Sequence, residues 1–300
     1  MLKINILVTV SSEYFSEAAI RRAAMLNRQF EGELTLLYII EEKMLRLIDR
    51  VSEYAMTTEE RVRAERNLVK EIKGRAEGML FERAAVITAE ERSEISSWRI
   101  EQGEYTRTIQ EYCKANRVDL IVMSFERATL LNYEILKWPS PSIWIEKGTA
   151  KALEKILALP SNLTLNRTLP EMAVEFARRF DAQLHIEYVV DRTHPHTMTK
   201  EGKIKKEERS EAQLIEKGEA FLRERQERYE KTVKLSTSLS TGRLERKAII
   251  TAREWGADLI ILGRELEVER TVLGLFRRDI RRDIRREIVS TSPCSVLLIK

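Results

Sequence analysis

The sequence predicts an α/β fold in which two similar domains each contain a five-stranded parallel sheet covered by helices on both faces. Two observations lead to this fold class. Short apolar runs alternate with longer amphipathic stretches, and strands that are apolar on both faces are typical of a buried parallel sheet. The chain also repeats itself, and 300 residues are enough for two domains of ordinary size.

Three segments of the first half recur in the same order in the second half, which indicates a duplicated fold. The matching pairs are Phe30–Ile40 with Phe180–Val190, Asp119–Met123 with Asp258–Leu262, and Pro139–Ile145 with Pro293–Ile299. The offset between partners changes along the chain, as insertions would cause. We expect one domain over residues 1–148 and the other over residues 153–300.

The first half is expected to form strands at 4–10, 34–40, 95–101, 119–123 and 142–146. Its helices are expected at 15–29, 57–88, 105–116 and 128–137. The second half repeats the pattern, with strands at 155–159, 184–190, 233–239, 258–262 and 295–299. Each crossover between parallel strands is right-handed, so the sheets are doubly wound and ligands bind beyond the carboxyl ends of the strands.

Two long helices allow two interpretations, because they exceed the length needed to cover a sheet. Each has an apolar stripe at helical spacing, as in a helix that packs on its sheet. The alternative is an arm that binds a partner. The stripes consist of Val62, Val69, Ile72, Ala76 and Met79 in one helix and of Leu214, Ile215, Phe221, Leu222 and Tyr229 in the other.

Composition excludes several classes of protein. The 52 basic and 48 acidic residues leave a net charge of only +4, so bulk charge predicts neither a nucleic acid nor a membrane as partner. No apolar run reaches the roughly 18 residues of a membrane span, and the sequence starts almost directly with an apolar strand. We therefore expect a cytoplasmic protein.

The residues that usually carry chemistry are scarce. GxGxxG, GxxxxGK and GxSxG motifs are absent. Cys113 and Cys294 lie far apart, which excludes a cysteine zinc site, and His194 and His196 lack a third metal ligand nearby. With three histidines in the chain, no serine relay can be identified. The sequence predicts no catalytic and no metal-binding residues.

An ordered set of signals occurs in both halves. In the first half it consists of the strand Ile6–Val10, the run Leu36–Ile40, Gly103 before a helix, Arg117–Met123 and Pro139–Ile145. In the second half it consists of Gly242, Trp255–Gly263 and Ser292–Ile299. This set resembles the tandem two-domain form of the universal stress protein family. The resemblance implies Rossmann-like domains with strand order 3-2-1-4-5, a role in the stress response, and a pseudo-dimer in which the last strands, Ile143–Ile145 and Val296–Ile299, pair.

Family members that bind ATP carry a G-x2-G-x9-G-[ST] loop after the fourth strand and an Asp that closes the first strand. The segment Ser124–Asn132 has no glycine and places Glu126 where phosphate would lie. The second half keeps only Gly263 of the loop, and the Asp is replaced by Ser11 in one half and by Ser161 or Asn162 in the other. We therefore expect no ATP and no other cofactor.

The sequence favours a non-enzymatic protein of the universal stress type that acts through protein contacts, with an unidentified partner and with itself as a homodimer. The alternative is a nucleotide- or anion-binding sensor built on the second domain. Its candidate ligand-binding residues are Ser161, Val189, Gly263, Arg264, Arg277 and Arg278.

The arginine-rich segment Phe276–Ile288 also has more than one interpretation. Its apolar residues recur every four positions, as in a helix that covers a sheet, and its arginines can pair with acids on the same helix. They could instead bind an anion or an acidic partner. The interleaved Asp279, Asp283 and Glu287 argue against nucleic acid, because they cancel much of the positive field.

Overall fold

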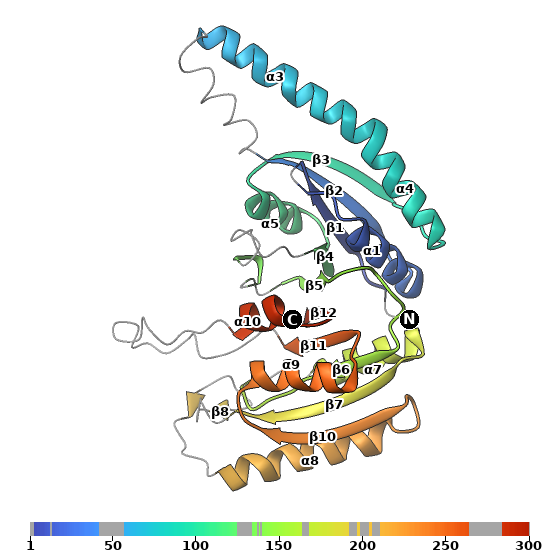
Figure 1. Cartoon of the computed structure of the whole chain (residues 1–300), viewed down its shortest axis with the longest axis vertical. Helices are drawn as coiled ribbons and strands as arrows, with labels where there is room; N and C mark the ends of the chain where they lie inside the picture. The colour runs from blue at the N-terminus through green and yellow to red at the C-terminus, as the bar shows by residue number, and fades with distance from the viewer. Residues whose placement is uncertain are drawn as a thin grey trace. The chain divides into compact units, whose positions relative to one another are not determined.

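The computed structural model of the chain describes residues 3–12, 14–41, 57–124, 134–136, 138, 140–163, 168–191, 197–198, 204–205, 211–263 and 284–299. The chain divides into two compact units, Met1–Ile135 and Leu136–Lys300. Each unit is an α/β structure in which helices lie against a sheet (Figure 1).

In the described part of unit 1, four parallel strands form a sheet in the order β3-β2-β1-β4. The strands are β1 Ile6–Ser11, β2 Leu34–Glu41, β3 Ser97–Gly103 and β4 Leu120–Ser124. Every residue of β1 is buried, as expected for the central strand of a sheet covered on both faces. The edge strand β3 has no fully buried residue and starts two residues later than predicted.

Among the described helices of unit 1, three follow a residue whose side chain caps their first turn. The helices are α1 Glu17–Phe30, α3 Thr58–Arg75, the π-helical turn η1 Ala76–Leu80, α4 Phe81–Glu90 and α5 Tyr105–Ala115. The Ser16 hydroxyl accepts from the backbone N–H of Ala19, and Thr57 and Glu60 form a capping box before α3. The helix predicted over 57–88 is therefore observed as α3, η1 and α4 in succession. Most of the helix predicted at 128–137 lies outside the described residues.

In unit 2, six of the described strands form a sheet in the order β10-β7-β6-β11-β12-β5. The strands are β5 Ser142–Glu146, β6 Lys155–Ala158, β7 Gln183–Val190, β10 Leu235–Thr241, β11 Leu259–Gly263 and β12 Ser295–Ile299. The helices are α7 Leu169–Phe180, α8 Glu211–Tyr229, α9 Leu244–Trp255 and α10 Ile284–Thr291. The order from β10 to β12 is 3-2-1-4-5, as predicted.

Two short strands were not predicted. Strand β8, Thr197–Met198, pairs antiparallel with β9, Ile204–Lys205, and the two form a separate ribbon in the connection between β7 and α8. Each strand has only two residues, too short to show a period in the sequence.

Strand β5, the last strand of the first repeat, belongs to unit 2. It runs antiparallel to β12, with Trp144 opposite Leu297, so the predicted pairing of the last strands is confirmed. The Trp144 ring also stacks on Phe176 of α7, with ring centroids 6.1 Å apart. The compact units therefore divide before β5, whereas residue 148 as the end of the sequence repeat stays a prediction.

The same aspartate contact occurs in both repeats. The Asp119 carboxylate accepts a hydrogen bond from the backbone N–H of Asn5, just before β1, at 2.9 Å. The Asp258 carboxylate accepts from the backbone N–H groups of Glu154 and Lys155, at the start of β6, at 2.9 Å each. Each aspartate joins the start of the fourth strand of its repeat to the start of the first strand. This shared contact explains why an aspartate stands before the fourth strand in both repeats.

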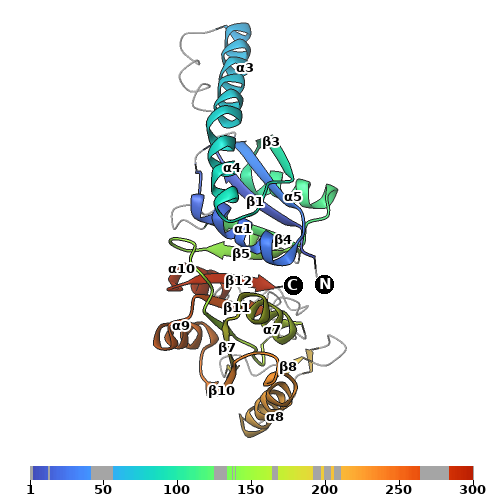
Figure 2. The same ribbon diagram turned by 90° about the vertical axis from the view of Figure 1, so that its right-hand side faces the viewer.

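The two long helices have different environments. Helix α8 packs on β7 and β10 so closely that a Cβ atom on Gly218 would lie 2.7 Å from side-chain atoms of Tyr188 and Leu239. Helix α8 therefore covers its sheet. Helix α3 has Ile72 as its one buried residue and runs past the sheet of unit 1 in both views (Figures 1 and 2).

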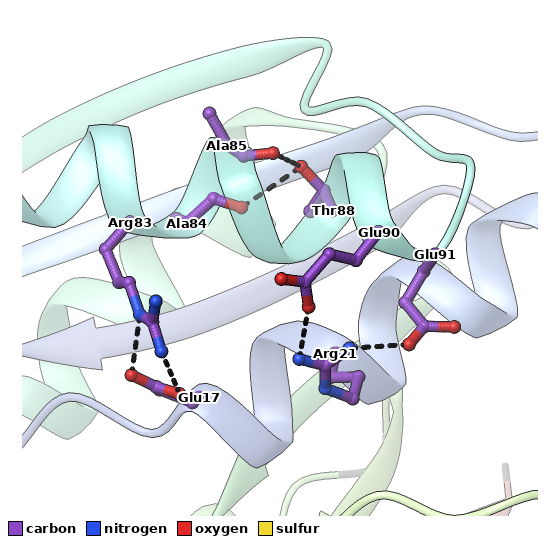
Figure 3. Close-up of polar contacts among 8 residues, drawn as sticks. All are labelled: Glu17, Arg21, Arg83, Ala84, Ala85, Thr88, Glu90 and Glu91. Carbon is purple, nitrogen blue, oxygen red and sulfur yellow. Dashed lines mark hydrogen bonds and ion pairs between the residues drawn. The ribbon is translucent and has the colours of Figure 1, made fainter.

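Helix α4 is held against α1 by ion pairs at the base of this long helix (Figure 3). The Arg83 guanidinium donates two hydrogen bonds to Glu17, at 2.8 and 3.1 Å. Arg21 of α1 donates to Glu90 at 2.6 Å and to Glu91 at 2.7 Å. The contacts join α4, and not α3, to the rest of unit 1.

The Glu17–Arg83 contact predicts a pH dependence. The hydrogen bond from Arg83 holds the pKa of the Glu17 carboxyl below its ordinary value of 4.5. Because the folded-state pKa is the lower one, ionised Glu17 stabilises the fold above pH 4.5, and this contribution is lost as the pH falls through the lowered value. Both side chains are about half exposed, so solvent screening keeps the effect small.

We expect Glu17→Gln to lower the melting temperature near neutral pH and to match the parent in acid. Glu77→Gln, which removes an exposed carboxylate from η1, is the control and should change little at either pH. Melting temperatures measured between pH 3 and pH 7 would test this. A constant difference between Glu17→Gln and the parent across that range would contradict it.

Candidate functional site

The carboxyl edge of a parallel sheet is the usual place for a ligand site in this fold class. In unit 2, Ser161 follows β6 and forms an isolated parallel bridge with Val189 of β7. The Ser161 hydroxyl accepts a hydrogen bond from the backbone N–H of Leu163 at 3.2 Å. Gly263 ends β11, the strand beside β6. Ser161, Val189 and Gly263 therefore lie along one edge.

Asn162 and Asp191 bind each other at this edge. The Asn162 side-chain amide donates to the backbone oxygen of Asp191 at 3.1 Å, and its oxygen accepts from the backbone N–H of Asp191 at 2.7 Å. Both residues are buried. This pair of hydrogen bonds joins the loop after β6 to the end of β7 and uses the amide that could otherwise bind a nucleoside.

The Asp191 carboxylate lies at the amino end of α9. One of its oxygens accepts from the backbone N–H of Leu244, the first residue of α9, at 2.8 Å. Gly242, with φ of 139°, turns the chain from β10 into this helix. A carboxylate is favoured at a helix amino end, where unpaired N–H groups carry partial positive charge. The place where a ligand anion could bind α9 is therefore filled by a side chain of the protein itself.

The corresponding edge of unit 1 is also joined by its own polar groups. The Ser12 hydroxyl accepts from the backbone N–H of Glu41 at 3.1 Å, and Ser12 N donates to Ile39 O at 2.8 Å. The Tyr14 hydroxyl lies 3.2 Å from the Ser124 hydroxyl. These contacts connect the loops after β1, β2 and β4.

A half-buried tyrosine also contributes to this edge. The Tyr105 hydroxyl, on the first residue of α5, lies 2.7 Å from the Thr9 hydroxyl of β1. Burial raises the pKa of Tyr105 well above its ordinary value. A phenol that stays protonated acts here as a structural hydrogen-bonding group and holds α5 to the central strand.

The structure brings together only part of the predicted ligand-binding set. Ser161, Val189 and Gly263 share the carboxyl edge of unit 2, whereas Arg264, Arg277 and Arg278 lie outside the described residues. The described part of the arginine-rich segment begins with α10, in which Ile284 and Ile288 are buried as the four-residue repeat predicts.

Sequence reasoning missed Asp191, which joins the loop after β6 to the amino end of α9. Its signal was an acidic residue directly after the apolar run that ends at Val190, followed much later by Gly242 at the start of a helix. Those two signals are separated by more than fifty positions, so only the fold shows that they meet.

His185 and Cys294 lie in environments that suit a structural role and not a reactive one. The ring nitrogens of His185 lie 2.8 Å from the Ser236 hydroxyl and 2.9 Å from the Ser238 hydroxyl. Burial raises the pKa of the Cys294 thiol to about 11, which disfavours the reactive thiolate at neutral pH. No group of three or more metal-ligating side chains occurs among the described residues, and His194 and His196 lie outside them. Among the described helices, none combines the length and the apolar character that a membrane span requires.

Comparison with known proteins gives two successive family matches. The model of the universal stress protein family matches residues 4–136 and residues 155–300. A universal stress protein from Archaeoglobus fulgidus DSM 4304 has a similar structure, with 14% identity, a TM-score of 0.62, and coverage of 98% of this chain and 96% of that chain. A putative universal stress protein from Pseudomonas aeruginosa UCBPP-PA14 has 19% identity, a TM-score of 0.58, and coverage of 99% and 93%.

At these identities the solved structures show the fold, whereas the family matches show the relationship. No match was found among the curated proteins. The two segments that the family model matches cover most of the chain, and each corresponds to one of the parallel α/β repeats described above. This protein therefore belongs to the universal stress protein family and has two of the family's domains in tandem.

Proposed function

We propose that this chain is a non-enzymatic universal stress protein that acts through protein contacts and does not bind ATP in the manner usual for the family. One observation carries the proposal. At the carboxyl edge of unit 2, Asn162, Asp191 and the amino end of α9 bind one another, so these polar groups are already used within the protein.

The first unit supports the same proposal. Ser11 stands where ATP-binding members have an aspartate, and its hydroxyl accepts from the backbone N–H of Tyr14 at 3.2 Å. Ser12 is likewise engaged with the end of β2. An aspartate could accept hydrogen bonds from a nucleoside, whereas a serine hydroxyl that serves the adjacent turn offers less.

The long helix of unit 1 supports action through contacts. Val62 is 38% exposed, Met79 is 71% exposed and Val86 is 50% exposed. All three lie on the continuous helical stretch from α3 to α4, which the ion pairs of Arg21 and Arg83 anchor at its α4 end. Anchoring one end fixes the direction of the helix while α3 offers its surface to other molecules.

We expect millimolar Mg-ATP to leave the melting temperature of the protein unchanged. Ligand at 100 times its Kd stabilises a folded protein by about 2.7 kcal/mol, which a thermal scan detects readily. A family member with a complete G-x2-G-x9-G-[ST] loop is the positive control for the assay.

A clear rise in melting temperature with Mg-ATP would contradict the proposal and favour the nucleotide sensor. Mass spectrometry of the small molecules released from the denatured protein provides a second measurement. An adenine nucleotide recovered in proportion to the protein would contradict the proposal in the same way, and an extract without one is the expected result.

A further inference from the structure

Strand β10 lies at the edge of the sheet of unit 2 and, among the described strands, has a neighbour on one side only. One backbone hydrogen bond marks each end of its pairing with β7. The N–H of Leu184 donates to Lys234 O at 2.9 Å, and the N–H of Gly242 donates to Val190 O at 3.0 Å. Hydrogen bonding alternates along a parallel pair, so the even-numbered residues between these ends direct their backbone groups toward β7. The backbone groups of Leu235, Thr237 and Leu239 therefore point outward.

This edge lacks the features that normally prevent strands from pairing. Leu235–Thr241 contains no charged residue and no proline, and its register with β7 continues through all seven residues without a bulge. Charges, prolines and bulges are the usual means by which natural edge strands avoid a partner. The edge strand of unit 1, β3, has such protection in Arg99 and Glu101, which are both exposed.

The sequence of β10 is complementary to itself when it runs antiparallel about Ser238. Residues with outward backbone groups must face one another, and this register places Thr237 opposite Leu239 of a second copy. On the other face of the sheet, Ser238 meets its own equivalent, and Ser236 lies opposite Ser240. Serine faces serine, threonine faces leucine, and no charge is brought close to a like charge.

An unsatisfied hydroxyl supports this register. The Ser240 hydroxyl makes no hydrogen bond within the described chain and is shielded from solvent there, so it gains a partner from a second copy by rotating about χ1. In the register about Ser238 its neighbour across the new pair is Ser236, which is exposed in the single chain. A serine hydroxyl both donates and accepts, so Ser236 can bind His185 of its own chain and Ser240 of the other.

We propose that two copies of this chain pair through β10, antiparallel about Ser238, so that the sheet of unit 2 continues across the contact. The interface consists of backbone hydrogen bonds at Thr237 and Leu239 and of a row of serine hydroxyls. It does not depend on the function proposed above, because it uses neither the carboxyl edge nor the long helix of unit 1.

Disulfide trapping tests the register. Ser238→Cys places two thiols directly opposite each other at a position without hydrogen bonds, where Cα atoms lie about 4.5 Å apart and a disulfide can form. Ser236→Cys is the matched control: it also removes one hydroxyl contact of His185, but its thiol faces Ser240. Both variants are made in a Cys113→Ser background, which leaves the buried Cys294 as the other thiol. We expect a covalent dimer from Ser238→Cys and none from Ser236→Cys; equal yields, or no dimer from either, would overturn the proposal.

Removal of one outward donor tests the interface without cross-linking. Thr237→Pro deletes an N–H that β7 does not use, and proline is tolerated at such edge positions. Sedimentation velocity over a concentration series should show a dimer for the parent and for Thr237→Val, and a monomer for Thr237→Pro with unchanged circular dichroism. A parent that is monomeric throughout, or a folded Thr237→Pro protein that dimerises like the parent, would refute the proposal. Should Thr237→Pro fail to fold, the disulfide experiment decides.

Discussion

Replacing Trp144 by alanine is expected to lower the free energy of unfolding by about 3–5 kcal/mol, the usual cost of truncating a fully buried aromatic residue. The Trp144 side chain is completely buried in β5 and stacks on Phe176. Its indole N–H donates to the Glu146 carboxylate at 2.6 Å, and Glu146 is buried as well. Alanine therefore removes a large packed ring and one donor to a buried charge at the same time.

Two further variants separate packing from hydrogen bonding. Trp144→Phe keeps an aromatic ring for Phe176 but removes the indole N–H, and Glu146→Leu removes the carboxylate that accepts the hydrogen bond. If the hydrogen bond contributes to stability, the double variant should lose less than the sum of the single losses. Urea unfolding followed by circular dichroism gives these values. A loss below about 1 kcal/mol for Trp144→Ala would show that β5 is not part of the cooperative core of unit 2.

Replacing Asp191 by alanine should cost about 2 kcal/mol, because it removes a helix cap and leaves a buried N–H without its acceptor. The affected N–H belongs to Leu244, which is buried at the start of α9. The backbone of Asp191 can still bind Asn162, so the effect should be confined to the side chain and to the first turn of α9.

Asp191→Asn is the matched variant, since its amide oxygen can accept from Leu244 while the negative charge is absent. We expect it to lose less stability than alanine. Hydrogen exchange at the Leu244 amide should become faster in Asp191→Ala and change less in Asp191→Asn. If alanine left that exchange rate unaltered, the carboxylate could not be the group that satisfies the amino end of α9.

Much of the fold could be predicted from local patterns. Strands such as Ile6–Ser11 are apolar on both faces, and that property is written in consecutive residues. The duplication was visible because Asp119 and Asp258 precede similar apolar runs, and both make the same contact at the start of a first strand. The third strand of each repeat begins two residues later than the sequence predicts, because the half-buried edge strands β3 and β10 have weaker apolar patterns.

The candidate site and the role of the long helices depended on contacts between distant residues. A stripe at helical spacing is the same in α3 and α8, so the sequence could not tell a sheet-covering helix from one with a single buried residue. Asp191 looked like one acid among 48 until the fold placed it beside Leu244. Local sequence determines which residues avoid water and with what period, whereas the partner of each buried polar group is set by chain segments that meet only when the sheet assembles.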